Sequence, residues 1–426
     1  MTVHHHIENS KMETIEKQLK NAAKATTAIQ SLSDQQKQAL LLALALRLRQ
    51  EKSAIITNNR QDLDKMDDAD PKKDRLLLTE ERIEALAESL EDIAKLPNPA
   101  GVVLLERTLD NGLSVTKKTV PLGVVGVIYE SRPNVTIDVA ALCIRSGNVC
   151  LLRGGTDAFH TNTILTKLIH ETLAQFELDE NIVQLLPTDR KHVDELLSAT
   201  QYVDIIIPRG SQQLIDFVRN HAKVPVIETG AGVCHTYVET TAKLQQSAEI
   251  VANAKISRPS VCNALDTVLV DRTIATSFLN ILAPLLAAHE VEVFADDSSF
   301  DVLSTAGYPH LNVATEEDFG REFLALKCSV KVVADINEAL KHIHRFSSKH
   351  SEAILTEEPA LQERFLNEVD AAAVFVNAST RFTDGGVFGL GAEIGISTQK
   401  LHARGPFALE KLVTEKWLIK GTGQIR

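Results

Sequence analysis

The feature that most constrains this fold is an alternation, from Val124 onward, between short apolar runs and stretches of helical periodicity. Short β-branched runs predict strands, and the amphipathic stretches between them are long enough to be crossover helices. Strands joined in this way form a parallel sheet that is covered on both faces, so an α/β fold is expected. The expected strands are 124–128, 149–152, 182–185, 203–207 and 224–227, and the expected helices include 161–176 and 212–221.

A second alternating region follows Cys262 and predicts a second α/β domain. Its expected strands are 267–270, 291–294, 330–333, 353–355 and 373–376, and its expected helices are 274–289, 337–346 and 360–369. No Ser- or Pro-rich linker lies between the two regions. We therefore expect the two domains to follow each other directly.

The chain before Val124 has a different pattern. Between residues 12 and 95, apolar residues recur at three- and four-residue steps, as in Leu40, Leu44 and Leu48, which predicts several packed helices. From Asp110 to Pro121 the pattern changes to alternation, bounded by Asn111-Gly112 and Pro121, which predicts a β-hairpin near 104–121. A hairpin exposed on at least one side could serve as an oligomerisation arm.

Composition excludes several classes of protein. The 426 residues include 45 Lys and Arg against 57 Asp and Glu, and the resulting net charge of −12 opposes binding to a phosphate backbone. Basic residues do not form a stripe interleaved with aromatic residues, so no nucleic-acid partner is expected. The most apolar run, 40–46, is far shorter than the ~18 residues of a membrane helix, so no membrane insertion is expected.

The N-terminus and the cysteines suggest a compartment. Segment 1–12 is polar, lacks the apolar core of an export signal, and contains His4–His6, which either are native or belong to an added tag. The five cysteines are odd in number and have no CxxC spacing, which argues against a disulfide framework and for reduced thiols. A cytoplasmic location is therefore expected. No His, Asp and Glu group has ligand spacing, so no metal is expected.

Cys262 differs from the other cysteines in its local context. The others lie mostly in apolar runs, where a buried cysteine acts as a small hydrophobe. Cys262 lies in a turn-forming stretch between a helix expected to end near Ile256 and a strand expected to begin near Leu265. Lys255 or Arg258 nearby would favour its thiolate form. Cys262 is therefore a candidate nucleophile, and a structural thiol is the alternative.

Two turns have features of phosphate-binding elements. Arg209-Gly210-Ser211 opens the expected helix 212–221, so Gly210 could let the backbone approach a phosphate that Ser211 and the free N–H groups would hold. Arg153-Gly154-Gly155 follows another expected strand and supplies a cation for a ribose or a 2′-phosphate. An ordinary glycine turn is the alternative in each case. Gly389-Leu-Gly391-Ala-Glu-Ile-Gly395 is rejected as a dinucleotide fingerprint because its last glycine comes one residue late.

Several motifs, in order along the chain, together resemble one enzyme family. They are Tyr129-Glu-Ser-Arg-Pro-Asn134, Arg153-Gly-Gly, Pro208-Arg-Gly-Ser, Gly232-Val-Cys-His235, Ser260-Val-Cys262-Asn-Ala, Thr383-Asp-Gly-Gly and Ser397-Thr-Gln-Lys-Leu-His-Ala-Arg-Gly-Pro406. From about Ala22 to Arg426, the sequence resembles the gamma-glutamyl phosphate reductases, or glutamate-5-semialdehyde dehydrogenases, of the aldehyde dehydrogenase superfamily.

The resemblance implies roles for individual residues. Cys262 matches the catalytic thiol, and Asn134 matches the asparagine whose amide helps to form the oxyanion hole. Glu322 resembles the glutamate that holds the nicotinamide ribose, although the usual Phe-Gly-Pro does not follow it. Glu228 lies about where aldehyde dehydrogenases place a general base, which this family does not reliably keep. Apart from the resemblance, Arg258 is the cation nearest to the thiol by sequence and is the candidate phosphate- or substrate-binding residue, with a surface or structural arginine as the alternative.

The resemblance also implies an aldehyde dehydrogenase-like architecture. We expect a Rossmann-like domain that binds NADPH and a smaller α/β domain that carries the thiol. The expected cofactor-binding domain comprises 1–103 and 122–253 with a return at 385–407, the catalytic domain 254–384, and a bridging oligomerisation element 104–121 and 408–426. A homo-oligomer is expected.

The implied reaction is NADPH-dependent reduction of L-glutamate 5-phosphate to L-glutamate 5-semialdehyde through a Cys262 thioester, on the route to proline. Glutamate 5-kinase is a possible partner because it would supply the labile acyl phosphate. Three alternatives remain. They are an ordinary NAD(P)-dependent aldehyde dehydrogenase with Glu228 as its base, a cysteine hydrolase using His235 or His402, and a non-catalytic binding protein with this fold.

Overall fold

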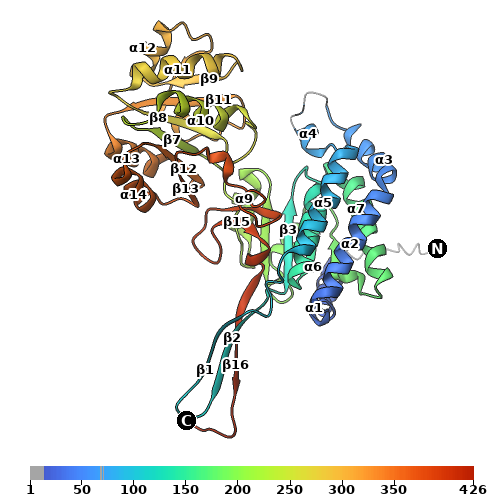
Figure 1. Cartoon of the computed structure of the whole chain (residues 1–426). Coiled ribbons are helices and arrows are strands. Elements are labelled where there is room, and N and C mark those ends of the chain that lie inside the picture. The colour runs from blue at the N-terminus through green and yellow to red at the C-terminus, as the bar shows by residue number, and fades with distance from the viewer. Residues whose placement is uncertain (1–13, 68–69, 71) are drawn as a thin grey trace, which may run out of the picture. The chain divides into compact units, whose positions relative to one another are not determined.

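The computed structural model describes residues 14–67, 70 and 72–426, and the chain divides into two units (Figure 1). The first unit comprises Met1–Val226 and Leu412–Arg426, and the second comprises Ile227–Lys411. His4–His6 lie outside the described residues.

Helices form the N-terminal part of the first unit, as the leucine periodicity predicts. α2 begins with a capping box, in which the Ser33 hydroxyl accepts from the Gln36 N–H and the Gln36 side chain accepts from the Ser33 N–H. In α5, Ile83, Leu90 and Ile93 are buried on one face, and this helix packs against α2. The helices are α1 (Glu16–Ser31), α2 (Asp34–Gln50), α3 (Lys52–Leu63), α4 (Lys72–Leu76) and α5 (Glu80–Lys95).

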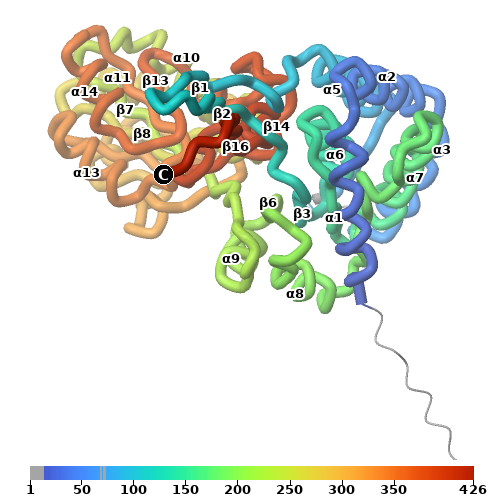
Figure 2. Tube along the Cα trace, turned by 90° about the horizontal axis from the view of Figure 1, so that it is seen from below, coloured from blue at the N-terminus to red at the C-terminus, as the bar shows by residue number. Residues whose placement is uncertain are grey.

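A four-stranded parallel sheet follows, in the order β5-β4-β3-β6. All six residues of β3 are buried, as expected for the centre of a sheet covered on both faces. α9 packs against β6, and α8 packs against α9 (Figure 2). The strands are β3 (Val124–Tyr129), β4 (Val149–Arg153), β5 (Val183–Leu185) and β6 (Ile205–Arg209). The helices are α6 (Asn134–Ser146), α7 (Phe159–Gln175), α8 (Lys191–Leu197) and α9 (Gln212–His221), with short 3₁₀ turns η1 (Thr156–Ala158) and η2 (Glu180–Ile182).

The carboxyl ends of these strands meet at one edge of the sheet. The register pairs Ile128 of β3 with Arg153 of β4, and Tyr129 of β3 with Arg209 of β6. The turns that follow β3, β4 and β6 therefore share this edge, which is where open parallel sheets bind ligands.

The expected hairpin is present and gains a third strand. β1 (Val103–Thr108) pairs with β2 (Ser114–Pro121), and β2 also pairs along its length with β16 (Val413–Lys420), all antiparallel. Figure 1 shows the three strands as a long ribbon with the C-terminus at its end. The C-terminal tail thus folds back onto the hairpin, although nearly 300 residues separate them in the chain.

The second unit is built on a seven-stranded parallel sheet in the order β10-β9-β11-β8-β7-β12-β13. Its strands are β7 (Cys234–Val238), β8 (Leu265–Asp271), β9 (Glu292–Ala295), β10 (Leu311–Val313), β11 (Lys327–Val333), β12 (Ser351–Leu355) and β13 (Ala373–Val376). Its helices are α10 (Leu244–Ile256), α11 (Ala275–Ala287), α12 (Asp297–Thr305), α13 (Ile336–Phe346) and α14 (Pro359–Glu368). The 3₁₀ turns η3 (Glu316–Gly320), η4 (Thr380–Phe382) and η5 (Leu409–Lys411) and an antiparallel pair, β14 (Glu393–Ser397) with β15 (Gly405–Ala408), complete the unit.

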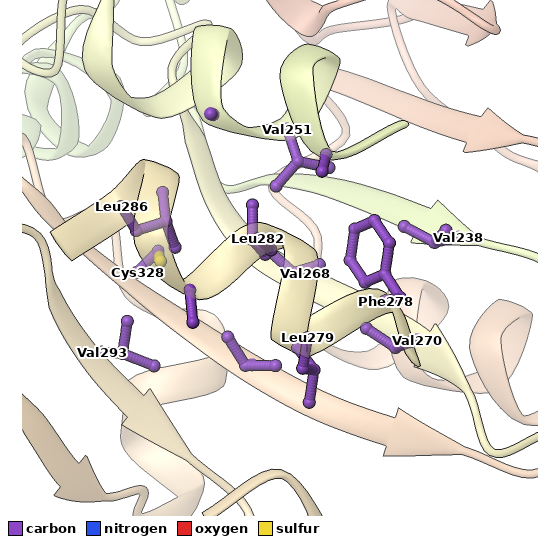
Figure 3. Packing of buried hydrophobic residues seen from close by; sticks show 14 of the residues in the cluster. Val238, Val251, Val268, Val270, Phe278, Leu279, Leu282, Leu286, Val293 and Cys328 are labelled. Carbon is purple, nitrogen blue, oxygen red and sulfur yellow. The ribbon is translucent and has the colours of Figure 1, made fainter. Parts of the chain in front are cut away.

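One face of this sheet is covered by α10 and α11 (Figure 3). Phe278, Leu279 and Leu282 of α11 are buried against Val268 of β8, and Cys328 of β11 lies in the same cluster. Burying each large side chain contributes ~1.5–3 kcal/mol. The apolar run around Cys328 therefore correctly predicts a buried core residue. The close packing of α10 and α11 also makes the sheet a rigid support for the loops of this unit.

Two expectations about boundaries differ from the structure. The expected strand 224–227 is only a single bridge between Ile206 and Val226, because Pro225 has no N–H to give a ladder. The second unit begins at Ile227 rather than 254 and includes 385–407, because β7 pairs with β8 and β12, and Ser397 of β14 bridges to Thr229. The sequence pattern does not predict β7 as a strand, so it places 227–253 in the first domain.

Within the described residues, no helix is long and apolar enough to cross a membrane. The same residues contain no group of three or more His, Cys, Asp or Glu side chains placed to hold a metal ion.

Candidate active site

Cys262 lies in the loop between α10, which ends at Ile256, and β8, which begins at Leu265, as the sequence predicts. It is half-buried, whereas the other four cysteines are buried. Burial raises the pKa of the Cys150, Cys234 and Cys328 thiols, which disfavours their thiolate forms. Among the cysteines, all of which are described, Cys262 is therefore the one that a substrate can reach.

The backbone of Cys262 is fixed by the segment that leads into β7. A Cβ added to Gly232 would lie 1.5 Å from the carbonyl oxygen of Cys262, so only glycine fits there. The Cys234 thiol donates a hydrogen bond to the same oxygen at 3.3 Å. The Gly232 N–H donates to Glu322 Oε1 at 2.9 Å. The sequence-predicted residues Cys262 and Glu322 are thus brought together around Gly232.

The sequence suggests that Lys255 favours the thiolate of Cys262, but the contacts recorded for Lys255 are with Asp266 and Ala325. Lys255 is buried, its Nζ lies 3.6 Å from Asp266 Oδ1, and it donates to the Ala325 carbonyl oxygen. Burial raises the pKa of Asp266 to about 6, although the Lys255 charge opposes this shift. Asp266 also accepts from the Phe323 N–H at 3.0 Å and so anchors the residue after Glu322. Lys255 therefore supports the Glu322 segment.

Two arginines lie near the thiol. Arg258 is exposed in the Cys262 loop, where the sequence places it. Arg381, on η4, is half-buried, and its Nε donates to the Ser257 hydroxyl at 3.2 Å. Burial and then the Arg258 charge lower the pKa of Arg381, while the charge of Cys262 opposes them. Sequence reasoning missed Arg381 because only the fold brings η4 to the loop.

Asn134 is the first residue of α6 at the carboxyl edge of the first unit's sheet. Its Nδ2 donates to Asp138 Oδ2 at 3.1 Å, and Ser89 donates to the other Asp138 oxygen at 3.4 Å. Burial raises the pKa of Asp138 to about 6 against the effect of these hydrogen bonds. An amide nitrogen carries two N–H groups, so Asp138 orients Asn134 with one and leaves the second for a ligand.

Arg153 and Gly154 lie at the same edge, at the end of β4. Arg153 Nη2 donates to the Thr188 carbonyl oxygen at 2.6 Å, whereas its buried Nε has no hydrogen-bond partner in the described chain. Burial lowers the pKa of Arg153, and the positive charge of Arg190 lowers it further. A Cβ on Gly154 would lie 2.3 Å from Asn162 Nδ2, so this glycine is required by packing.

The Gly210-Ser211 turn binds the side chain of Glu130, a contact that the sequence does not predict. The Ser211 N–H donates to Glu130 Oε2 at 2.9 Å, and its hydroxyl donates to Glu130 Oε1 at 3.3 Å. A Cβ on Gly210 would lie 2.6 Å from Glu130 Oε2. A carboxylate therefore already binds the start of α9, and a phosphate could use this N–H only after Glu130 turns away.

The residues invoked by the alternative reactions have structural partners. Glu228 accepts from Gln399 Nε2 at 3.2 Å, and its N–H donates to Gln399 Oε1 at 3.0 Å. His235 is completely buried, with Nδ1 3.0 Å from Glu352, and His402 Nε2 lies 2.7 Å from the Lys411 carbonyl oxygen. These contacts favour positioning roles over general-base chemistry.

Comparison with known proteins identifies the family. The model of the aldehyde dehydrogenase family matches residues 1–302. A gamma-glutamyl phosphate reductase of Chlorobium phaeobacteroides is 52% identical over 97% of this chain and 99% of its own length, and one of Legionella pneumophila is 52% identical with the same coverage.

Solved structures agree with the sequence relatives. The crystal structure of gamma-glutamyl phosphate reductase from Thermotoga maritima covers 97% of this chain and 100% of its own, with 39% identity and a TM-score of 0.92. An acetylating aldehyde dehydrogenase from Geobacillus thermoglucosidasius, 14% identical with a TM-score of 0.70 over 97% of each chain, shares the fold. The chain thus has an aldehyde dehydrogenase-like α/β fold and belongs to the gamma-glutamyl phosphate reductases of the aldehyde dehydrogenase family.

Proposed function

We propose that this chain reduces L-glutamate 5-phosphate to L-glutamate 5-semialdehyde and phosphate, with NADPH as the reductant, in proline biosynthesis. The observation that carries the proposal is a single accessible thiol, Cys262, in a loop fixed by its neighbours, in a chain about half identical to reductases named for this substrate.

Cys262 is the proposed nucleophile. An acyl phosphate is already activated, so the sulfur can attack its carbonyl carbon without prior oxidation. As the S–C bond forms, the C–O bond to phosphate breaks, and the thiol proton ends on the departing phosphate. The product is a glutamyl thioester on Cys262.

Asn134 and the backbone N–H of Cys262 are the proposed oxyanion hole. Negative charge develops on the carbonyl oxygen at each tetrahedral stage, and preformed donors stabilise it without reorganisation. Asp138 supports this role by fixing the Asn134 amide through a hydrogen bond. The second amide N–H is the proposed donor to the substrate oxygen.

The proposed cofactor-binding residues are Arg153, Gly154, Gly210 and Ser211 of the first unit and Glu322 of the second. The partnerless Nε of Arg153, close to a second cation at Arg190, suits the 2′-phosphate that distinguishes NADPH from NADH. Glu322, held by Gly232, suits a ribose hydroxyl. When bound, the reduced nicotinamide supplies a hydride to the thioester carbon.

The last step returns the thiol. The reduced thioester takes up one proton from solvent and becomes a thiohemiacetal. In its collapse the S–C bond breaks, the hydroxyl proton passes to the sulfur of Cys262, and the aldehyde is released. No water molecule has to be activated, which fits a Glu228 carboxylate engaged by Gln399. Arg258 is the proposed contact for the phosphate group, because it lies in the Cys262 loop and is exposed.

The assembly and location are part of the proposal. The ribbon of β1, β2 and β16 has two edge strands and exposed apolar side chains, which suits contact with a second copy in a homo-oligomer. A cytoplasmic enzyme acting beside glutamate 5-kinase would receive the acyl phosphate before it decomposes.

The test supplies the labile substrate as it forms. Purified chain is mixed with glutamate, ATP, glutamate 5-kinase and NADPH, and NADPH absorbance and released phosphate are followed. We expect NADPH oxidation that requires all components and the aldehyde as product. A complete mixture that leaves NADPH unchanged would contradict the proposal.

A further inference from the structure

The loop that carries Cys262 is joined to the segment around the 3₁₀ turn η4 by hydrogen bonds from the side chain and to the main chain of one residue, Asn263. Asn263 Nδ2 donates to the Thr383 carbonyl oxygen at 2.9 Å and to the Arg381 carbonyl oxygen at 3.3 Å. In return, the Thr380 hydroxyl donates to the Asn263 carbonyl oxygen at 2.8 Å. Asn263, Thr380 and Thr383 are all buried, so these bonds are shielded from water.

This junction places a second arginine beside the loop. Arg381 is the middle residue of η4, and its Nε donates to the Ser257 hydroxyl at 3.2 Å, one residue before Arg258. Its guanidinium is half-buried, and the charges of Arg258, Cys262 and Asp384 all act on it. Asp384 also accepts hydrogen bonds from the Gly386 and Val387 N–H groups, so these groups as well as Arg381 stabilise its negative charge.

Arg381 is half-buried and Arg258 is exposed, and their like charges repel each other, so an anion that pairs with both guanidinium groups is favoured here. The thiolate of Cys262 supplies one negative charge, but the reaction brings a second anion of higher charge, the phosphate that leaves the acyl group. The planar fork of an arginine binds two phosphate oxygens at once. One nitrogen of Arg381 is engaged by Ser257, and this contact fixes the direction of the remaining N–H groups.

We propose that Arg381 is a phosphate-binding catalytic residue that, with Arg258, holds the phosphate of the acyl phosphate and, in reverse, the inorganic phosphate that attacks the thioester. This inference rests on the proposed function. Asn263 is a positioning residue that acts through η4. In reverse, a phosphate oxygen forms the bond to the thioester carbon, the S–C bond breaks, and the proton of the phosphate passes to the sulfur.

The test measures oxidation of glutamate 5-semialdehyde by the full chain with NADP⁺ while inorganic phosphate is varied. Arg381→Ala is expected to raise the KM for phosphate at least ~10-fold, as for loss of a charged hydrogen-bond donor, and to leave the KM for NADP⁺ within ~2-fold. Arg381→Lys, which keeps the charge without the fork, should fall between. Arg364→Ala is the matched control, because Arg364 is a partly buried arginine of the same unit that pairs with Glu368.

A second measurement does not need turnover. The rate of Cys262 alkylation by iodoacetamide is followed against pH, and the midpoint should move upward in Arg381→Ala and less in Arg381→Lys, because a nearby cation favours the thiolate. A merely structural tie between η4 and Ser257 would lower thermal stability and move neither the phosphate KM nor this midpoint.

The outcomes separate the two claims. If the unmodified chain depends on phosphate but folded Arg381→Ala and Arg381→Lys keep its phosphate KM and alkylation profile, the assignment of Arg381 is wrong and the proposed function stands. If the unmodified chain itself oxidises the aldehyde equally well without phosphate, both are wrong. Should Arg381→Ala not fold, a phosphate KM in Arg381→Lys equal to that of the unmodified chain also overturns the assignment.

Discussion

At the scale of residues, surroundings rather than residue type separate Cys262 from the other cysteines. The same thiol group is inert in the core at Cys328 and accessible in a loop at Cys262. Surroundings also determine the residue type at position 232. Only glycine fits there, because the Cys262 carbonyl group lies where a side chain would begin.

Replacement of the thiol tests the covalent step. Cys262→Ser should lower turnover by at least ~10³-fold, because a hydroxyl is a far weaker nucleophile than a thiolate, while NADPH binding measured by fluorescence persists. Cys143→Ala is the control, since Cys143 is completely buried, and it should keep the chemistry. Substantial turnover by Cys262→Ser would show that no thioester forms there.

Loss of the Asn134 amide tests the oxyanion hole. Asn134→Ala should lower kcat by ~10²-fold, the usual effect of removing one such donor, with little change in the KM for NADPH. Ser89→Ala serves as the control, because it removes the other donor to Asp138 and leaves Asn134 in place. If the main effect of Asn134→Ala were on NADPH affinity, Asn134 would belong to the cofactor site.

Asp138 makes stability depend on pH. Its pKa in the folded chain is about 6 against 3.8, so the folded state binds the proton more tightly, and ionisation above this range costs folding free energy. Asp138→Asn keeps an acceptor for Asn134 and should stabilise the chain by about 1–2 kcal/mol at pH 8, discounted for partial exposure. Urea unfolding should show this gain shrinking between pH 6 and 4. A gain that is the same at pH 8 and pH 4 would exclude the titration of Asp138 as its source.

The sequence predicts some of these residues and cannot predict others. Cys262 is recognisable because its loop is defined by neighbouring residues in the chain. Arg381 and the Glu130 contact with Ser211 are not, because distant segments create them. The pairing of Lys255 with Asp266 cannot be predicted for the same reason, since the two side chains meet only in the folded unit.

At the scale of elements, strands and helices with a clear period are predicted well. α9 and β13 have the predicted ends, and α10 and β8 flank the Cys262 loop where expected. The sequence does not predict β7 because His235, a polar residue, interrupts its apolar run. In the structure His235 is buried, and its contact with Glu352 on the neighbouring β12 offsets the free energy of burying the polar ring. Pairing between strands therefore decides what local pattern leaves ambiguous.

The ribbon gives the prediction for this scale. Trp417 and Ile419 of β16 are 49% and 57% exposed and lie on one face, two residues apart. The double variant Trp417→Glu with Ile419→Glu should lower the mass measured by light scattering, because charge would disrupt an apolar contact between copies. Lys416→Ala, on the opposite face, should keep the assembly. An unchanged mass in the double variant would exclude this face as the contact.

At the scale of the whole molecule, the two-unit α/β architecture follows from the alternation of strands and helices, but the limits of the units do not. The sequence places the boundary at 254, shortly before the Cys262 loop, whereas strand pairing moves it to Ile227. The proposed residues are distributed over both units, with Asn134 and Arg153 in the first and Cys262, Glu322 and Arg381 in the second. Activity should therefore require the full chain.

The central claim is that phosphate, and not water, is exchanged at the Cys262 thioester. Microscopic reversibility requires an enzyme that expels phosphate in one direction to use it in the other. The direct measurement is NADP⁺ reduction during oxidation of glutamate 5-semialdehyde, with and without inorganic phosphate. We predict a rate that rises and saturates with phosphate and is close to zero without it. A steady rate in phosphate-free buffer with release of free glutamate would contradict the account and make Glu228 the base of a hydrolytic aldehyde dehydrogenase.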